Sequence, residues 1–267
     1  MGRFDFKTRT GQISTIIQSG DQDAQAFFNR VTAAGGTLTS TEQVAIIQLV
    51  IDMKTFGIWN SMKAIYPMVG ASAAACAQNL KSSSFTGTFN GGVTFASTGI
   101  TTNGTNGFMN TNFKPLTESI AQNSFAFGIY CRNNVVSAVA FGATETNKNA
   151  YLTANSSFGL YSGNNDAEGL ITPNWSTGTG LFVNSRTLST GYTLSQNTTF
   201  KTRTSTSIGV TNLNLYLGAY NNVTNTATNF SAIEFAFNFI SSGLTNTEIS
   251  NLYSVVQSFQ TSLSRQV

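Results

Sequence analysis

The spacing of apolar residues predicts two helices near the start of the chain. After Asp21, apolar residues recur every three to four positions, and Gly35 then supplies the left-handed conformation that commonly ends a helix. Thr39 and Glu42 have the spacing of a capping box, in which each side chain binds a free backbone amide of the first helical turn. We therefore expect a second helix over 41–56, with an apolar face wide enough to be buried on more than one side.

Beyond about residue 70 the pattern changes to short alternating segments separated by Asn, Gly and Ser clusters, which is typical of β-strands. The predicted strands are 85–89, 124–132, 135–142, 158–163, 180–186, 200–206, 213–220 and 230–239. In the last of them, the odd-numbered residues from Ile233 to Phe239 are expected on one face of the sheet. Without intervening helices, this spacing indicates an antiparallel β-sandwich or jelly roll.

A further helix is expected at the end of the chain. Thr245 and Glu248 repeat the capping-box spacing, and apolar residues follow at intervals of three and four. This apolar stripe requires a partner, and we expect it to cover the sandwich edge or the N-terminal helices. The chain is thus predicted to be mostly β, with an N-terminal helical segment and a C-terminal helix. The predicted parts are an N-terminal arm (1–20), a helical lead-in or anchor (21–70), the jelly roll (71–243) and the C-terminal helix (244–267).

The composition indicates a folded protein with a neutral polar surface. Charged residues are 9% of the 267 residues, whereas Asn, Ser and Thr together supply 95, and 21 phenylalanines provide a core. The net charge is +3, and no block of lysines and arginines is present, so nucleic-acid binding is not expected. No apolar run reaches 18 residues and no signal-peptide pattern follows Met1, so we expect no membrane contact.

The chain has no histidine, which excludes Ser-His-Asp and Cys-His catalysis and histidine metal sites. Cys76 and Cys131 are too few for a disulfide scaffold, and we expect two free, buried thiols. No cofactor-binding motif is present: the Gly91-Gly92 and Asn103-Gly104 pairs lack the following Gly-Lys-Ser/Thr sequence and a βαβ context. We therefore expect neither a cofactor nor a metal ion.

Three segments of the second half resemble concanavalin A-like (laminin-G-like) jelly-roll modules. They are LFVNSRTL (181–188), LYLGAYNN (215–222) and FSAIEFAFNFISSGLTNTEISNLYSVV (230–256), the last being the most specific. Upstream, residues 41–70 followed by 89–108 resemble a helical lead-in fused to this jelly roll in structural proteins of tailed bacteriophages. The resemblance implies a virion component, such as a capsid decoration, head fibre or tail-associated protein, whose partners are other virion proteins, with self-association as a further expectation.

The resemblance does not imply an activity. Catalytic members of the concanavalin A-like class need two carboxylates flanking one sugar bond at about 5–5.5 Å, on a Glu/Asp/Glu strand motif that this chain lacks. We therefore expect a non-enzymatic protein that docks through its N-terminal region and presents its jelly roll. A carboxylate glycosidase using Asp166 or Glu168 is the least favoured alternative.

Two sets of candidate binding residues follow. Docking to a partner is assigned to basic and apolar residues of the N-terminal arm: Arg3, Phe4, Phe6, Lys7, Arg9, Ile16 and Ile17. The alternative function, a lectin-like module for a surface glycan, is assigned to Tyr161, Trp175 and Tyr192, because exposed aromatic rings bind the apolar faces of sugars. A loop over 162–169, with Asn164, Asn165, Asp166 and Glu168, offers oxygen ligands for Ca²⁺, although a solvated acidic turn is the favoured interpretation.

Overall fold

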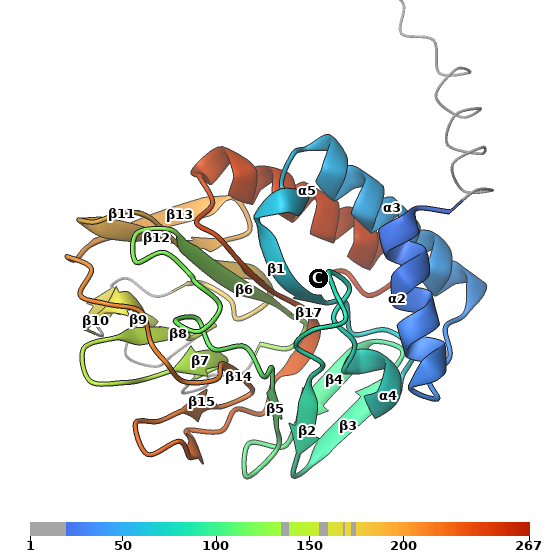
Figure 1. Cartoon of the computed structure of the whole chain (residues 1–267), viewed down its shortest axis with the longest axis horizontal. Coiled ribbons are helices and arrows are strands. Elements are labelled where there is room, and N and C mark those ends of the chain that lie inside the picture. The colour runs from blue at the N-terminus through green and yellow to red at the C-terminus, as the bar shows by residue number, and fades with distance from the viewer. Residues whose placement is uncertain (1–19, 135–138, 155–159, 168, 172–174) are drawn as a thin grey trace, which may run out of the picture.

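Two β-sheets and a layer of helices form the chain, which we describe from a computed structural model. The structure describes residues 20–134, 139–154, 160–167, 169–171 and 175–267. Sheet A and sheet B pack face to face as a sandwich, and helices α2, α3 and α5 cover the other face of sheet A (Figure 1). The fold class expected from the sequence is therefore confirmed.

Sheet A contains eight strands, with β1 and β4 lying on the same edge of β17. Its strands are β13 (Thr199–Thr204), β12 (Gly191–Gln196), β11 (Gly180–Leu188), β6 (Phe125–Cys131), β17 (Glu234–Ser241), β4 (Gly99–Thr102), β3 (Val93–Ala96) and β1 (Met62–Tyr66). The pairs in this sheet are antiparallel, as the sequence pattern predicts.

Sheet B contains nine shorter strands in the described part of the chain. They are β10 (Gly169–Ile171), β9 (Leu160–Asp166), β8 (Asn149–Leu152), β7 (Phe141–Ala143), β14 (Tyr216–Leu217), β5 (Phe108–Asn110), β2 (Thr88–Asn90), β15 (Tyr220–Asn221) and β16 (Ala227–Thr228). Strand β15 pairs with β7 in parallel, while the other described pairs of sheet B are antiparallel.

Helices α3 and α5 begin where the sequence predicts capping. The bounds of the helices are α2 (Gln22–Ala33), α3 (Ser40–Thr55), the short α4 (Ala73–Cys76) and α5 (Asn246–Ser262), with a 3₁₀ turn, η1, at Trp59–Ser61. Thr39 and Thr245 each form a complete capping box, with Glu42 and Glu248 respectively. Helix α5 packs against α3, as expected, and against β11, so its apolar stripe covers the outer face of sheet A and not the edge of the sandwich.

Sheet A separates two apolar cores. One lies between sheet A and the helices and includes Phe27, Leu49 and Phe259. The other lies between the two sheets and includes Phe127 and Phe141. A strand with both faces buried carries a near-continuous apolar sequence, which explains the composition of β6 and β17.

Two sequence-based expectations are corrected. Residues 62–66, which belong to the expected helical lead-in, form strand β1 of sheet A, so this sheet begins before residue 71. The expected single face in 230–239 is broken by a bulge between Phe235 and Phe237. Because a bulge inserts one residue into the alternation, Phe235 enters the core between the sheets while Phe237 and Phe239 face the helices.

Cys76 and Cys131 are both free and buried, as expected, and burial raises the pKa of each thiol. In the described part of the chain, none of the helices combines the length and the apolar character needed to cross a bilayer.

Candidate functional site

The outer face of sheet B carries a group of tyrosines around Gly142. Phe141 belongs to the core between the sheets, so the alternation of β7 places Gly142 on the opposite face. Tyr151 of β8, Tyr216 of β14 and Tyr220 of β15 are all register partners of Gly142. A Cβ atom on Gly142 would clash with Tyr151, and its φ of +141° also favours glycine. The missing side chain thus lets aromatic rings approach each other.

An open groove of about 380 Å³ lies beside Tyr220, and we call it the Tyr220 groove. Its lining residues are Thr144, Glu145, Thr146, Asn147, Asn149, Ala167, Tyr220, Asn222 and Val223. The Tyr220 side chain is half-buried, and its ring centroid lies 6.0 Å from that of Tyr151 with the planes 33° apart. The groove therefore combines an aromatic ring with amide, hydroxyl and carboxylate groups.

One wall of the groove is the turn that follows β7. The Lys148 amide donates a hydrogen bond to the Glu145 carbonyl (3.0 Å), and Asn147 takes the left-handed conformation with φ of +59°. The Glu145 carboxylate accepts hydrogen bonds from the Thr211 hydroxyl (3.1 Å) and from the Asn212 amide (2.9 Å), while Lys148 Nζ lies 3.7 Å from its other oxygen. The carboxylate is therefore fixed in place, and its charge is partly offset by Lys148.

The facing wall is held by the side chain of Asn222. Its Oδ1 accepts hydrogen bonds from the backbone amides of Thr224 (3.0 Å) and Thr226 (3.1 Å), which leaves the amide nitrogen without a described hydrogen bond. At the base, Asn149 Oδ1 accepts a hydrogen bond from the Thr144 hydroxyl (2.5 Å). These internal bonds fix the orientation of the groove's polar groups before any ligand arrives, which lowers the entropic cost of binding.

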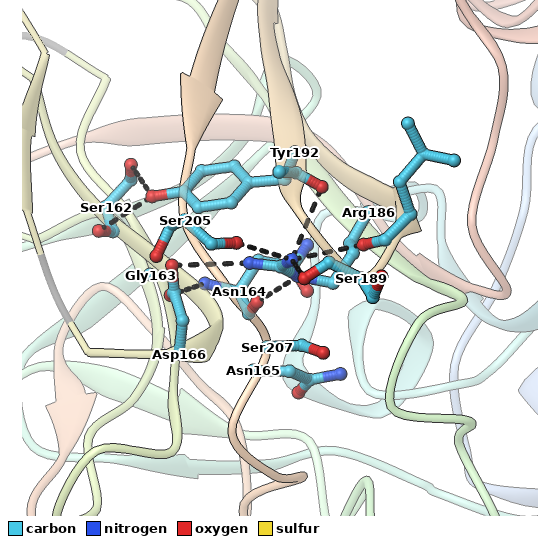
Figure 2. A network of polar contacts seen from close by, with 12 residues as sticks. Ser162, Gly163, Asn164, Asn165, Asp166, Arg186, Ser189, Tyr192, Ser205 and Ser207 are labelled. Carbon is cyan, nitrogen blue, oxygen red and sulfur yellow. Dashed lines mark hydrogen bonds and ion pairs between the residues drawn. The ribbon is translucent and has the colours of Figure 1, made fainter.

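A buried polar network between the sheets supports the strand that leads to Ala167 at the groove (Figure 2). Asp166, the last residue of β9, is the register partner of Asn149. Arg186 Nη2 lies 3.3 Å from Asp166 Oδ2, and both side chains are fully buried. Arg186 Nε also donates a hydrogen bond to the Asn164 carbonyl (2.6 Å). The network therefore fixes the end of β9 against sheet A.

Burial dominates the electrostatics of this network. Burial raises the pKa of Asp166, although hydrogen bonds from Ser205 and the Asn164 amide and the charge of Arg186 act to lower it. It also lowers the pKa of the Arg186 guanidinium, whose carbon lies 5.2 Å from the Tyr192 ring centroid. Because Asp166 and Arg186 are both inaccessible to solvent, we interpret the network as structural support for the groove and not as a catalytic centre.

The three tyrosine and tryptophan residues predicted to bind sugar do not form a common exposed platform. Tyr161 is 40% exposed on the outer face of sheet B. Trp175 is 8% exposed and belongs to the core between the sheets, and Lys201 Nζ lies 4.7 Å from its ring centroid. Tyr192 is 2% exposed, and its hydroxyl donates to the Ser162 carbonyl (3.0 Å). Neither Trp175 nor Tyr192 therefore offers an open ring face for stacking in this structure.

The other predicted sites have different outcomes. The expected loop over 162–169 is instead strand β9 as far as Asp166, with Asn164 and Asn165 fully buried, and Glu168 lies outside the described residues. Among the residues that the structure describes, no three Cys, Asp or Glu side chains gather as metal ligands. The predicted docking residues of the arm also lie outside the described residues: Arg3, Phe4, Phe6, Lys7, Arg9, Ile16 and Ile17.

Sequence reasoning missed the Tyr220 groove. The segment LYLGAYNN contains Tyr220 and Asn222, and the turn over 144–149 is rich in polar residues, so both walls carry a visible signal. The parallel pairing of Tyr220 with Gly142 brings the two walls together, and no local sequence pattern indicates this pairing.

Comparison with solved structures finds domains of the same fold. Domain 4 of AbnA, an extracellular GH43 arabinanase from Geobacillus stearothermophilus solved in complex with arabinotriose, matches with a TM-score of 0.51 and 16% identity, over 72% of this chain and 98% of that domain. The binding domain of botulinum neurotoxin serotype D matches with a TM-score of 0.51 and 12% identity, over 74% of this chain and 52% of that domain.

At these identities the similarity establishes the β-sandwich fold and nothing finer. The chain spans about half the length of the neurotoxin binding domain that it matches. No protein-family model and no curated protein matches the sequence.

Proposed function

We propose that the chain is a non-enzymatic binding module that holds a neutral glycan in the Tyr220 groove. The observation that carries this proposal is the combination, in one concave site, of a half-exposed tyrosine ring with amide and hydroxyl groups fixed by internal hydrogen bonds. Open clefts with a few oriented polar groups are typical of small-ligand sites.

The chemistry of the groove favours a sugar over other ligands. A sugar ring presents an apolar face of C–H groups, which packs on an aromatic ring, and an edge of hydroxyl groups, which exchange hydrogen bonds with amides and carboxylates. The Asn222 amide group is available as a donor on one wall. Because Lys148 partly offsets the charge of Glu145, this turn does not strongly attract an ion of either sign, which favours a neutral ligand.

The test is calorimetric titration of the full chain with neutral oligosaccharides. The panel begins with arabinotriose, because the similar domain of the arabinanase was solved with it, and includes xylo-, gluco- and galacto-oligosaccharides. We expect one member to bind, and we expect Tyr220→Ala to weaken that binding about tenfold, since the loss of an aromatic contact costs about 1.4 kcal/mol.

Tyr161→Ala is the matched control, because Tyr161 is an exposed tyrosine of the same sheet that does not line the groove. This variant is expected to bind the oligosaccharide with unchanged affinity, and thermal unfolding of both variants confirms that they are folded. Binding lost in Tyr161→Ala and retained in Tyr220→Ala would move the site to the residue predicted from the sequence. Absence of binding across the panel would refute the proposal.

A second candidate function is a structural role in a bacteriophage virion, as a capsid decoration, head fibre or tail-associated protein. It is supported by the resemblance of segments 41–70 and 89–108 to such proteins and by the neutral polar composition of the chain. In this role the arm over 1–20 attaches the protein to its virion neighbours. Purified chain mixed with undecorated particles should then bind them, and deletion of residues 1–20 should abolish the binding. Binding that survives this deletion, or no binding, would contradict the role.

A further inference from the structure

A second groove, of about 430 Å³, lies in the helical layer between α3 and α5, and we call it the helical groove. Its apolar lining includes Val44 and Leu49 of α3 and Val255 and Phe259 of α5. Val44 remains 47% exposed, whereas the other three side chains are buried. Exposed apolar surface in a concave site is a common mark of a binding surface, because covering it releases water from contact with apolar groups.

The chain enters the described structure beside α3, on the face of this helix opposite the groove. Asp21 caps the N-terminus of α2, and its carboxylate accepts a hydrogen bond from Lys54 Nζ (2.8 Å) in the last turn of α3. Asp52, a charged residue of the groove lining, precedes Lys54 by two residues, which is about 3 Å along the helix axis but about 200° around it. The segment that precedes Gly20 must therefore cross α3, over about one helix diameter of 10 Å, to reach the helical groove.

The preceding segment has the chemistry and the length to occupy the groove. It carries Ile13, Ile16 and Ile17, which match the apolar residues of the lining, and residues 10–19 include no charged side chain. From Thr41 to Asp52 the groove extends for about 16 Å along α3. Ten extended residues span about 33 Å, so residues 10–19 are long enough both to cross α3 and to follow the groove.

We infer that residues 10–19 of the same chain bind in the helical groove, with their isoleucine side chains on Val44 and Phe259. An intramolecular segment has a high effective concentration at a site within its reach, so it binds ahead of a second copy. This contact is independent of the proposed glycan site, because it involves the opposite layer of the molecule.

Hydrogen–deuterium exchange of the full chain tests the inference. We expect backbone amides in 10–19 to exchange about tenfold more slowly than in a free peptide of the same sequence. The double substitution Ile16→Asp with Ile17→Asp should abolish this protection, and so should Val44→Asp in the groove. The matched controls are Ser14→Asp with Gln18→Asp, which adds the same charge to polar arm positions, and Leu116→Asp, at an exposed apolar residue outside the groove. Both controls should keep the protection.

Three results would overturn the inference. The first is exchange of the arm amides at free-peptide rates in the unmodified chain. The second is protection that Val44→Asp leaves unchanged, which would place the arm elsewhere. The third is protection that appears only with a concentration-dependent dimer in light scattering, which would make a second copy the source of the arm.

Discussion

Arg186 is a fully buried cation at the centre of the polar network. Besides its ion pair with Asp166, it donates hydrogen bonds to backbone carbonyls of Asn164, Leu188, Ser189, Gly191 and Ser205. One side chain therefore joins the end of β9, the hairpin between β11 and β12 and the segment after β13. Breaking a buried ion pair is costly because the remaining charge loses the opposite charge and stays inaccessible to water.

Replacing Arg186 with Met should lower the free energy of unfolding by about 3–5 kcal/mol, because the buried Asp166 carboxylate loses its ion pair and the buried carbonyls lose a charged donor. Urea unfolding followed by tyrosine and tryptophan fluorescence measures this loss. Adding Asp166→Asn to Arg186→Met removes the buried charge and should recover part of the stability. A single variant as stable as the unmodified chain would show that the network does not support the sandwich.

Residue patterns identified the aromatic residues but not the faces on which they lie. The sequence pattern does not distinguish Tyr192 from Tyr161, yet the first is buried between the sheets and the second is exposed. Which face of a strand is covered depends on its partners across the sandwich, and local alternation does not contain that information. The same reason explains why Asp166 looked like part of a solvated loop: its partner Arg186 is 20 residues away in the other sheet.

The C-terminal helix is fastened by the short tail that follows it. Arg265 is 1% exposed and donates hydrogen bonds to the carbonyls of Pro67 (2.7 Å), Met68 (2.8 Å) and Ala236 (3.0 Å). The tail thereby joins α5 to the end of β1 and to β17, which lie far apart in the sequence. Burial lowers the pKa of Arg265 to about 10, so the guanidinium stays charged at neutral pH.

Arg265→Ala should lower the free energy of unfolding by about 3 kcal/mol, because buried carbonyl groups lose charged donors without gaining water. Chemical denaturation gives the value. The control is Val267→Ala, since the Val267 side chain is 46% exposed and the tail's hydrogen bonds with Tyr130 use only the Val267 backbone. Equal stability of the two variants would contradict a fastening role for Arg265.

Elements with strong local signals were predicted well. The capping boxes at Thr39 and Thr245 locate α3 and α5 within a residue or two, because a cap depends only on neighbouring residues. Strand β1 was missed because its five residues lie directly after η1 and pair with β17, about 175 positions away. The predicted strand 213–220 is in fact split at Gly218 into β14 and β15, which creates one wall of the Tyr220 groove.

At the scale of the whole molecule, the two candidate surfaces lie in different layers. The Tyr220 groove belongs to sheet B, while the helical groove lies beyond sheet A in the layer of α3 and α5 (Figure 1). Both sheets and two apolar cores separate them. Changes at sites that share no contacts are usually additive in free energy.

Val44→Asp should therefore leave oligosaccharide affinity within about twofold of the unmodified chain, even where it releases the arm. The dissociation constant of the best ligand in the panel, measured for both proteins by calorimetry, gives the comparison. A tenfold change would reveal coupling between the helical layer and sheet B.

The most direct test of a glycan site in the Tyr220 groove is an NMR titration of the isotope-labelled full chain with the best oligosaccharide of the panel. We predict that the backbone amides of 144–149 and 220–223 shift in a saturable manner, while those of α3 and α5 stay in place. Saturable shifts centred on Tyr161 or on the helical groove, with the Tyr220 groove unaffected, would contradict the account.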